Sequence, residues 1–174
     1  MRHNVYGLNN RESASRRDGC AEKKGPQSIG KSRGGLTTKI HTLAISERTA
    51  FEISLTGGEV HDCAPGKDLL ITAGERLVET DLAVDKAYSS AEFRLLAEIL
   101  GYNVVSPPPS NLKEPWDYDK EQYKKRNKIE RLFCRVKKRF RKVFTRYDKL
   151  AVIYLGFVYF ALILEILKIS VNTP

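Results

Sequence analysis

Residues 123–137 read YKKRNKIERLFCRVK, and this stretch decides the fold prediction. On a helix of about 3.6 residues per turn, an arc of about 60° holds Tyr123, Arg126, Glu130 and Lys137. A neighbouring stripe is apolar and suits a core face; it holds Ile129, Leu132, Phe133, Val136, Phe140 and Val143. A single carboxylate therefore lies among cations at the border of a buried helix face.

The composition favours a polyanionic partner. The chain has 174 residues, enough for one domain with a core, and 30 Lys and Arg against 21 Asp and Glu give a net charge of +9. Nucleic acid is the first candidate, an anionic membrane surface is the second, and a basic protein without such a partner is the third. Three widely spaced cysteines exclude a disulfide framework and suit a reducing cytoplasm; they are Cys20, Cys63 and Cys134.

Strands and helices alternate along the chain. Apolar alternation and short apolar runs predict strands at 36–45, 51–55, 82–84 and 103–105. Helical spacing predicts helices at 65–79, from Ser89 or Ser90 to Gly101, at 119–144 and from Asp148 to Lys168. We therefore predict an α/β layer fold with mixed strands, in which residues 36–169 form the domain. Residues 1–35 form an irregular basic segment, in which 4–8 ends a strand before a loop.

Two carboxylates are candidates for chemistry. Asp85 ends the apolar strand 82–84, and the carboxyl ends of strands in open sheets are where ligands bind. Glu130 on its helix could reach the same edge, and carboxylates are the ligands that Mg²⁺ prefers. The alternatives are structural, because a strand-end Asp often serves a turn and Glu130 can pair with Arg126 or Lys137 along its helix.

Five blocks in order resemble DDE-type bacterial insertion-sequence transposases of the branch with a Tyr-x2-Arg-x3-Glu-x6-Lys helix. That helix is one block, and the others are Gly34–His41, Gly58–Asp62, Val84–Tyr88 and Thr145–Lys149. The resemblance covers roughly residues 13–167. It implies an RNase H-like mixed sheet flanked by helices, N-terminally truncated, that cleaves and transfers DNA strands with Mg²⁺ or Mn²⁺. It also implies that Asp85 and Glu130 are the second and third catalytic, metal-binding acids.

The first acid of the family falls near Asn9 and Asn10 in this resemblance. An amide oxygen cannot supply the negative charge that holds a divalent ion, and Asp18 lies in a loop segment. The family's upstream DNA-binding segment is also missing from the resemblance. We therefore expect a truncated or catalytically degenerate transposase, or one that residues from an upstream reading frame complete.

DNA contacts are implied for the same helix. Tyr123, Arg126 and Lys137 resemble the family's positions beside the glutamate, where cations bind phosphates. The alternative is a solvated basic helix. Two aromatic residues, Trp116 and Tyr118, could stack on an unpaired base, although a packed loop aromatic is the more common role. The partners implied are transposon ends and target DNA, in the bacterial cytoplasm near the nucleoid, with a homo-oligomer as an open alternative.

Several motifs receive structural interpretations. Gly25–Ser32 matches the phosphate-loop pattern GxxxxGKS, but no apolar strand precedes it and no helix follows, so we expect no nucleotide. Residues 150–164 are apolar but short for a membrane span, so we expect a buried helix and no membrane partner. We expect His41 to be structural within its strand. His61 either positions phosphate near the catalytic edge or makes a loop hydrogen bond.

Three functions remain open at this stage. The first is an active or complementable transposase. The second is a non-catalytic DNA-binding remnant. The third is a small basic membrane-associated protein held by residues 150–164.

Overall fold

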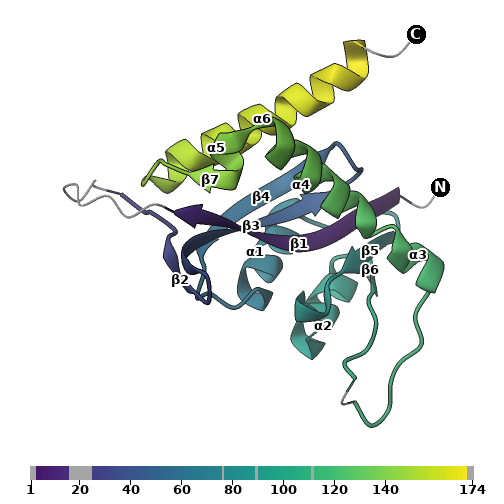
Figure 1. The fold of residues 1–174 in the computed structure, drawn as a ribbon. Coiled ribbons are helices and arrows are strands. Elements are labelled where there is room, and N and C mark those ends of the chain that lie inside the picture. The colour runs from purple at the N-terminus through teal and green to yellow at the C-terminus, as the bar shows by residue number, and fades with distance from the viewer. Residues whose placement is uncertain (1–2, 16–24, 76, 89, 111, 172–174) are drawn as a thin grey trace.

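A seven-stranded sheet forms the centre of the computed structural model, which describes residues 3–15, 25–75, 77–88, 90–110 and 112–171. Its strands are β1 (His3–Ser15), β2 (Gly30–Ser32), β3 (Gly35–Ala44), β4 (Ala50–Gly57), β5 (Thr80–Val84), β6 (Tyr102–Val105) and β7 (Thr145–Arg146). Its helices are α1 (Cys63–Ala73), the 3-10 turn η1 (Lys86–Tyr88), α2 (Ala91–Ile99), α3 (Lys120–Lys124), α4 (Asn127–Arg139), α5 (Arg141–Phe144) and α6 (Ala151–Val171). The α/β fold predicted from the sequence is confirmed (Figure 1).

The main sheet has the strand order β4-β3-β1-β5-β6. Strand β3 is antiparallel to both β4 and β1, whereas β5 is parallel to both β1 and β6. The short strands β2 and β7 extend this sheet by pairing with β3 and β1. This mixed order, with hairpin-connected strands first and crossover-connected strands afterwards, is consistent with an RNase H-like domain.

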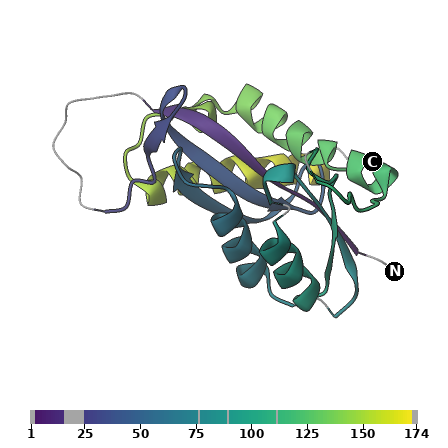
Figure 2. The same ribbon diagram turned by 90° about the horizontal axis from the view of Figure 1, so that it is seen from below.

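Helices α1 and α2 cover one face of the sheet and lie side by side in the view from below (Figure 2). Their apolar residues join those of the strands in a lower core, made of Leu43, Leu69, Leu70, Leu82, Val84, Tyr88, Phe93, Ala97 and Tyr102. Ser90 caps α2 because its side chain accepts a hydrogen bond from the Phe93 backbone N–H at 3.2 Å. Helices α1 and α2 thus form the lower layer of the fold, which packs against β5 and fixes its end.

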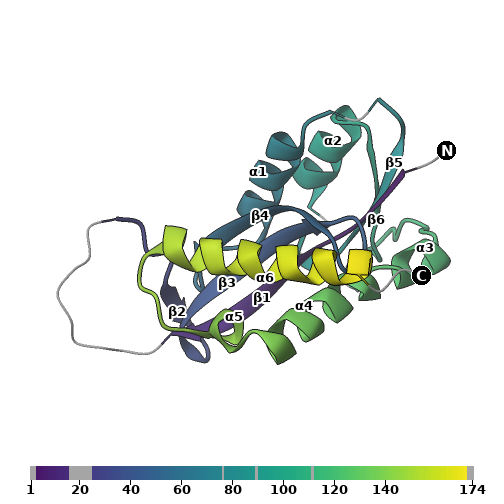
Figure 3. The same cartoon turned by 90° about the horizontal axis from the view of Figure 1, so that it is seen from above.

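Helices α4, α5 and α6 cover the opposite face and form the upper layer of the fold (Figure 3). The upper core contains Ile40, Ala44, Ile53, Ile129, Leu132, Phe133, Val136, Val143, Tyr154, Val158, Ala161 and Leu162. Helix α6 is buried along one side as expected, but its other side exposes Val152, Ile153, Phe160, Ile163 and Leu167. Within the described ranges, we find no helix that combines the length and the apolar character of a membrane span.

Strand β1 corrects the expectation of an irregular N-terminal segment. The strand continues past residue 8 to Ser15, although its sequence is polar from Asn9 onward. It lies between β3 and β5, which supply backbone hydrogen-bond partners on both sides. Strand formation at such a central position depends on neighbouring strands more than on local sequence, which is why the pattern did not predict it.

Two predicted helices are shorter than expected. Helix α1 ends at Ala73 rather than residue 79, because Gly74 adopts a φ of 74° and its N–H bonds back to the last turn. The long basic helix is divided into α3, α4 and α5. Its second break is at Phe140, which leaves the helical region with φ −119° and ψ 88°.

Candidate functional site

Asp85 follows the last residue of β5, a strand whose five residues are all buried. Its side chain accepts a hydrogen bond from the Lys86 backbone N–H at 2.7 Å, and its carbonyl accepts one from Tyr88 N–H at 2.9 Å. The turn η1 therefore fixes the Asp85 backbone. The side chain keeps 44% of its surface exposed, so one carboxylate is presented to solvent at the sheet edge.

Glu130 lies in the first turn of α4. The neighbouring residues Ile129, Leu132 and Phe133 are buried in the upper core and hold the helix against the sheet. Glu130 is one position beyond this buried face and retains 38% exposure. Helix α4 thus places a second partly exposed carboxylate, that of Glu130, on the upper side of the sheet.

Arg126 joins the two acids. Its Nη1 lies 3.5 Å from Asp85 Oδ2, and its Nη2 lies 2.9 Å from Glu130 Oε1. The Arg126 side chain is only 17% exposed, less than either partner. The structure therefore brings Asp85 and Glu130 together at one guanidinium. Asp85 and Arg126 are 41 residues apart in the sequence.

A 3-10 turn positions Arg126. The N–H groups of Lys125, Arg126, Lys128 and Ile129 each bond to the carbonyl three residues earlier. Side chains three residues apart lie above one another in such a turn, so Tyr123 comes beside Arg126. The Arg126 Cζ lies 5.8 Å from the Tyr123 ring centroid, and burial raises the pKa of the Tyr123 phenol. The ring thus forms one wall of the guanidinium site.

Lys137 lies near the far end of α4. It lies 11 residues beyond Arg126, or about 16 Å along a helix axis. Its Nζ is 5.1 Å from the ring centroid of Phe144 on α5. Of the three predicted DNA-contacting residues, the structure brings Tyr123 and Arg126 to the acids and leaves Lys137 at the other end of α4.

The register of β1 separates the two asparagines. Asn9 lies opposite Thr42 and Asn10 lies opposite His41. Directly opposed positions in antiparallel strands belong to the same sheet face. His41 bonds to Tyr88, which lies on the α1 side of the sheet. Thr42, the next residue along the strand, therefore points to the opposite side, which α4 covers. By register, position 9 shares the side of Thr42 and position 10 shares the side of His41.

Position 9 is also level with Asp85. Leu8 pairs in parallel with Val84, the residue before Asp85. Position 9 is thus the next residue along β1, as position 85 is the next residue after β5. The backbone register therefore aligns position 9, rather than position 10, with the end of β5.

A polar group supports the site from the lower layer. His41 is fully buried, with Nδ1 2.9 Å from the Tyr88 hydroxyl and Nε2 2.7 Å from Thr56 Oγ1. Burial lowers the pKa of His41 from 6.5 to about 4, and burial also raises the pKa of Tyr88. The imidazole is therefore neutral at pH 7 and connects β3 to the turn that follows Asp85.

Lys39 and Asp62 form a second ion pair, which the sequence did not reveal. The Lys39 Nζ lies 2.9 Å from Asp62 Oδ1 and also donates to the Val60 carbonyl at 2.8 Å. Both side chains are largely buried, with 13% and 17% exposure. The pair attaches the Gly58–Asp62 block to β3. His61 in this block accepts a hydrogen bond from the Cys63 N–H at 3.3 Å, which is one of the two roles considered for it.

Arg146 is the other residue that sequence reasoning missed. It is 1% exposed, and its guanidinium donates to the carbonyls of Asp148, Lys149 and Ser28 and to the Thr38 hydroxyl. This cation therefore closes the loop before α6 onto β3, and has a structural role. Its only sequence signal was membership of the resembling block Thr145–Lys149.

The described part of the site offers two carboxylates to a metal ion, those of Asp85 and Glu130. Among the residues whose side chains the structure describes, no group of three His, Cys, Asp or Glu side chains is close enough to hold a metal. Asp85 and Glu130 share the Arg126 guanidinium. Two carboxylates can hold one ion, whereas a bridged pair of ions needs a further acid.

Two other predicted features have structural roles. Trp116 donates to the Ser106 carbonyl at 2.9 Å and stacks with Arg94 at 4.3 Å, so it is a packed loop aromatic. Gly30–Ser32 is a strand paired with β3, so the GxxxxGKS segment is not followed by the helix N-terminus that a phosphate loop requires.

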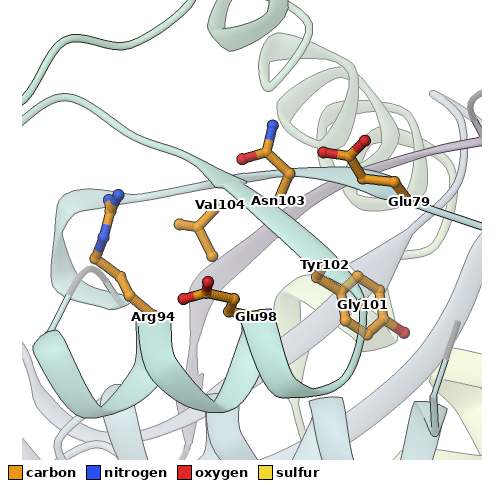
Figure 4. Close-up of a pocket in the computed structure, with 7 residues that line it drawn as sticks. All are labelled: Glu79, Arg94, Glu98, Gly101, Tyr102, Asn103 and Val104. Atoms are coloured by element: carbon orange, nitrogen blue, oxygen red, sulfur yellow. The ribbon is translucent and has the colours of Figure 1, made fainter.

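A cavity of about 380 Å³ lies at the β6 edge of the sheet, away from Asp85 and Glu130. Figure 4 shows Arg94 and Glu98 from α2 facing Asn103 and Val104 of β6 across it. Asp85 and Glu130 are not part of its lining. The side chains of Asp85 and Glu130 are instead partly exposed to solvent.

Comparison with known protein families identifies one match. A family model described as "Transposase DDE domain" matches residues 13–164, most of the chain. Comparisons with curated proteins and with solved structures give no significant match.

Proposed function

Because this chain belongs to the transposase DDE domain family, we propose that it is a DNA-transposition domain that binds DNA but is incomplete for strand cleavage and transfer. The observation that carries the proposal is the acid pair of Asp85 and Glu130 on one guanidinium, with Asn9 at the neighbouring β1 position. The family itself supports DNA transposition as the general function and DNA as the partner.

The chemistry of strand cleavage explains why the missing charge matters. Water or a 3′-hydroxyl attacks a phosphodiester, a new P–O bond forms, and the bond to the leaving 3′-oxygen breaks. In phosphoryl transfer of this kind, carboxylate-held Mg²⁺ or Mn²⁺ ions stabilise the attacking and leaving oxygens. A neutral amide at position 9 cannot replace an acid in holding them.

The upper layer supplies the DNA-binding surface in this proposal. Residues 124–146 contain twelve Lys and Arg and one acid, Glu130. Lys138, Arg141 and Lys142 are exposed on the α4 and α5 surface. We propose transposon ends and target DNA as ligands, in the nucleoid of a bacterial cytoplasm; a homo-oligomer on the DNA is compatible with this proposal.

Restoring the acid tests the proposal. The purified chain and its Asn9→Asp and Asn10→Asp variants are incubated with Mn²⁺ and a supercoiled plasmid carrying the DNA that flanks the gene. We expect no nicking by the unaltered chain. Asn9→Asp should gain Mn²⁺-dependent nicking that Glu130→Gln abolishes; the pairing of Leu8 with Val84 supports position 9 as the neighbour of Asp85. Asn10→Asp, on the other sheet face, is the matched control and should gain nothing.

Two outcomes would contradict the proposal. Nicking by the unaltered chain that Asp85→Asn and Glu130→Gln both abolish would show that its catalytic site is complete. Equal nicking by Asn9→Asp and Asn10→Asp would show that position 9 is not part of the site.

A further inference from the structure

The Arg126 guanidinium occupies the place where a cation would serve both acids. It donates to Glu130 at 2.9 Å and reaches Asp85 at 3.5 Å. We propose, on the basis of the proposed function, that Arg126 is a positioning residue: it is the resident cation of the acid pair and releases the pair to a divalent ion when a DNA phosphate takes the guanidinium.

The fixed position of Arg126 supports its role as a resident cation. Its side chain is 17% exposed, the Tyr123 ring lies 5.8 Å from Cζ, and the 3-10 turn holds its backbone. A planar guanidinium can donate to two carboxylates at once, whereas a lysine ammonium is a single point charge. One guanidinium therefore holds the two acids together.

The two contacts differ in strength, and this difference sets the order of release. The 2.9 Å contact to Glu130 has the length of a normal charge-assisted hydrogen bond, whereas 3.5 Å to Asp85 is long for one. Asp85 is also the more exposed acid, at 44% against 38%. Exchange should therefore begin at Asp85, which is the first carboxylate that becomes free to bind an incoming ion.

Electrostatics couples the ion to the DNA. A divalent ion between Asp85 and Glu130 would lie within a few ångströms of the guanidinium, and like charges at that distance repel. A phosphate accepts two parallel hydrogen bonds from a guanidinium and offers Arg126 another partner. DNA should then raise the affinity for the ion, and the ion should raise the affinity for DNA by the same factor.

Mn²⁺ binding tests this inference without any nicking. The electron paramagnetic resonance signal of free Mn²⁺ is titrated against the full chain, with and without a 20-base-pair duplex. For the unaltered chain, we expect DNA to tighten Mn²⁺ binding by about tenfold. Arg126→Gln should bind Mn²⁺ about tenfold more tightly than the unaltered chain without DNA, and should gain little when DNA is added.

Lys124→Gln is the matched control. It removes the same charge two residues away, from an exposed side chain whose ion-pair partner is Glu121. Lys124→Gln should bind Mn²⁺ as weakly as the unaltered chain without DNA, and DNA should tighten its Mn²⁺ binding by the same factor. Arg126→Lys keeps the charge without the two-armed contact, so its DNA-free affinity should fall between those of the unaltered chain and Arg126→Gln.

Unchanged or weaker Mn²⁺ binding by folded Arg126→Gln would overturn the inference, as would an equal gain in Lys124→Gln. If Arg126→Gln fails to fold by circular dichroism, Arg126→Lys decides: an affinity equal to that of the unaltered chain rejects the inference. The proposed function fails separately. Absence of DNA binding by the unaltered chain at low salt would reject that function, while the DNA-free comparison of Mn²⁺ affinities would still report on Arg126.

Discussion

His41 is a buried base whose protonation opposes folding. Its ring is fully buried and bonds to Tyr88 and Thr56, and burial lowers its pKa from 6.5 to about 4. Between these two values the unfolded chain binds a proton that the folded chain does not. The stabilisation is therefore complete above about pH 6.5 and is lost as the pH falls towards 4.

We expect His41→Asn to remove this part of the pH dependence. From pH 7.5 to 4.5, the free energy of unfolding of the unaltered chain should fall by roughly 2 to 3 kcal/mol more than that of His41→Asn. Urea unfolding followed by circular dichroism at the two pH values measures the difference. Carboxylates that titrate in the same range contribute to both proteins and cancel in the comparison. Parallel pH profiles for the two proteins would contradict this assignment.

Single residues were predictable where one element decides their surroundings. The position of Asp85 followed from an apolar strand, and that of Glu130 followed from one helix face. The ion pair of Arg126 with Asp85 was not predictable, because it depends on how α4 crosses the end of β5. The four hydrogen-bond partners of Arg146 likewise come together only in the folded chain.

Among the elements, a charged contact joins α4 to α6. Arg139 Nη1 lies 2.6 Å from Glu165 Oε1, and the Glu165 side chain is 1% exposed while Arg139 is 45% exposed. A buried carboxylate that loses its partner keeps the cost of its desolvation. The pair therefore connects the end of α4 to the last helix.

Arg139→Ala should lower the free energy of unfolding by about 2 kcal/mol, because it strands the Glu165 carboxylate. Arg141→Ala removes a nearby exposed cation and should change stability by less than about 0.5 kcal/mol. The double variant Arg139→Met, Glu165→Leu should recover most of the loss, since no buried charge remains. Thermal and urea unfolding of the four proteins provide the test. An equal effect of the two alanine variants would show that the pair is not stabilising.

Strands and helices were predictable where apolar residues recur along them at the spacing typical of a strand or a helix. Strands β3 and β4 show alternation and were found within one or two residues of their predicted ends. Strand β1 has no such pattern beyond residue 8, and its neighbours in the sheet impose its extended backbone. The 3-10 turn between α3 and α4 has the same residue types as a continuous helix, so helical spacing could not reveal it.

On the scale of the whole molecule, the charge is concentrated on one layer. The net charge is +9, and the residues from 124 to 146 hold twelve of the 30 cations. Several of these cations have internal roles: Arg126 binds the acids, Arg135 donates to the Glu47 carbonyl at 2.8 Å, and Arg146 is buried. The number of phosphates that DNA can neutralise is therefore smaller than the sequence count.

This leads to a quantitative expectation for DNA binding. If about five phosphates are neutralised, the logarithm of the association constant should fall with the logarithm of salt concentration at a slope of about −4.5. Removing two exposed cations of the upper layer, in Lys138→Gln with Arg141→Gln, should reduce the slope by about 2 and weaken binding to all sequences alike. Fluorescence anisotropy of a labelled duplex between 50 and 200 mM salt measures both quantities.

The matched control removes two exposed cations elsewhere, Lys31 on β2 and Lys113 in the loop after β6. If DNA lies on the α4 and α5 surface, Lys31→Gln with Lys113→Gln should leave the slope close to that of the unaltered chain. Both double variants lower the net charge by two, from +9 to +7, so a general effect of charge would affect them equally. Equal slopes for the two variants would show that net charge, rather than the upper layer, governs the interaction.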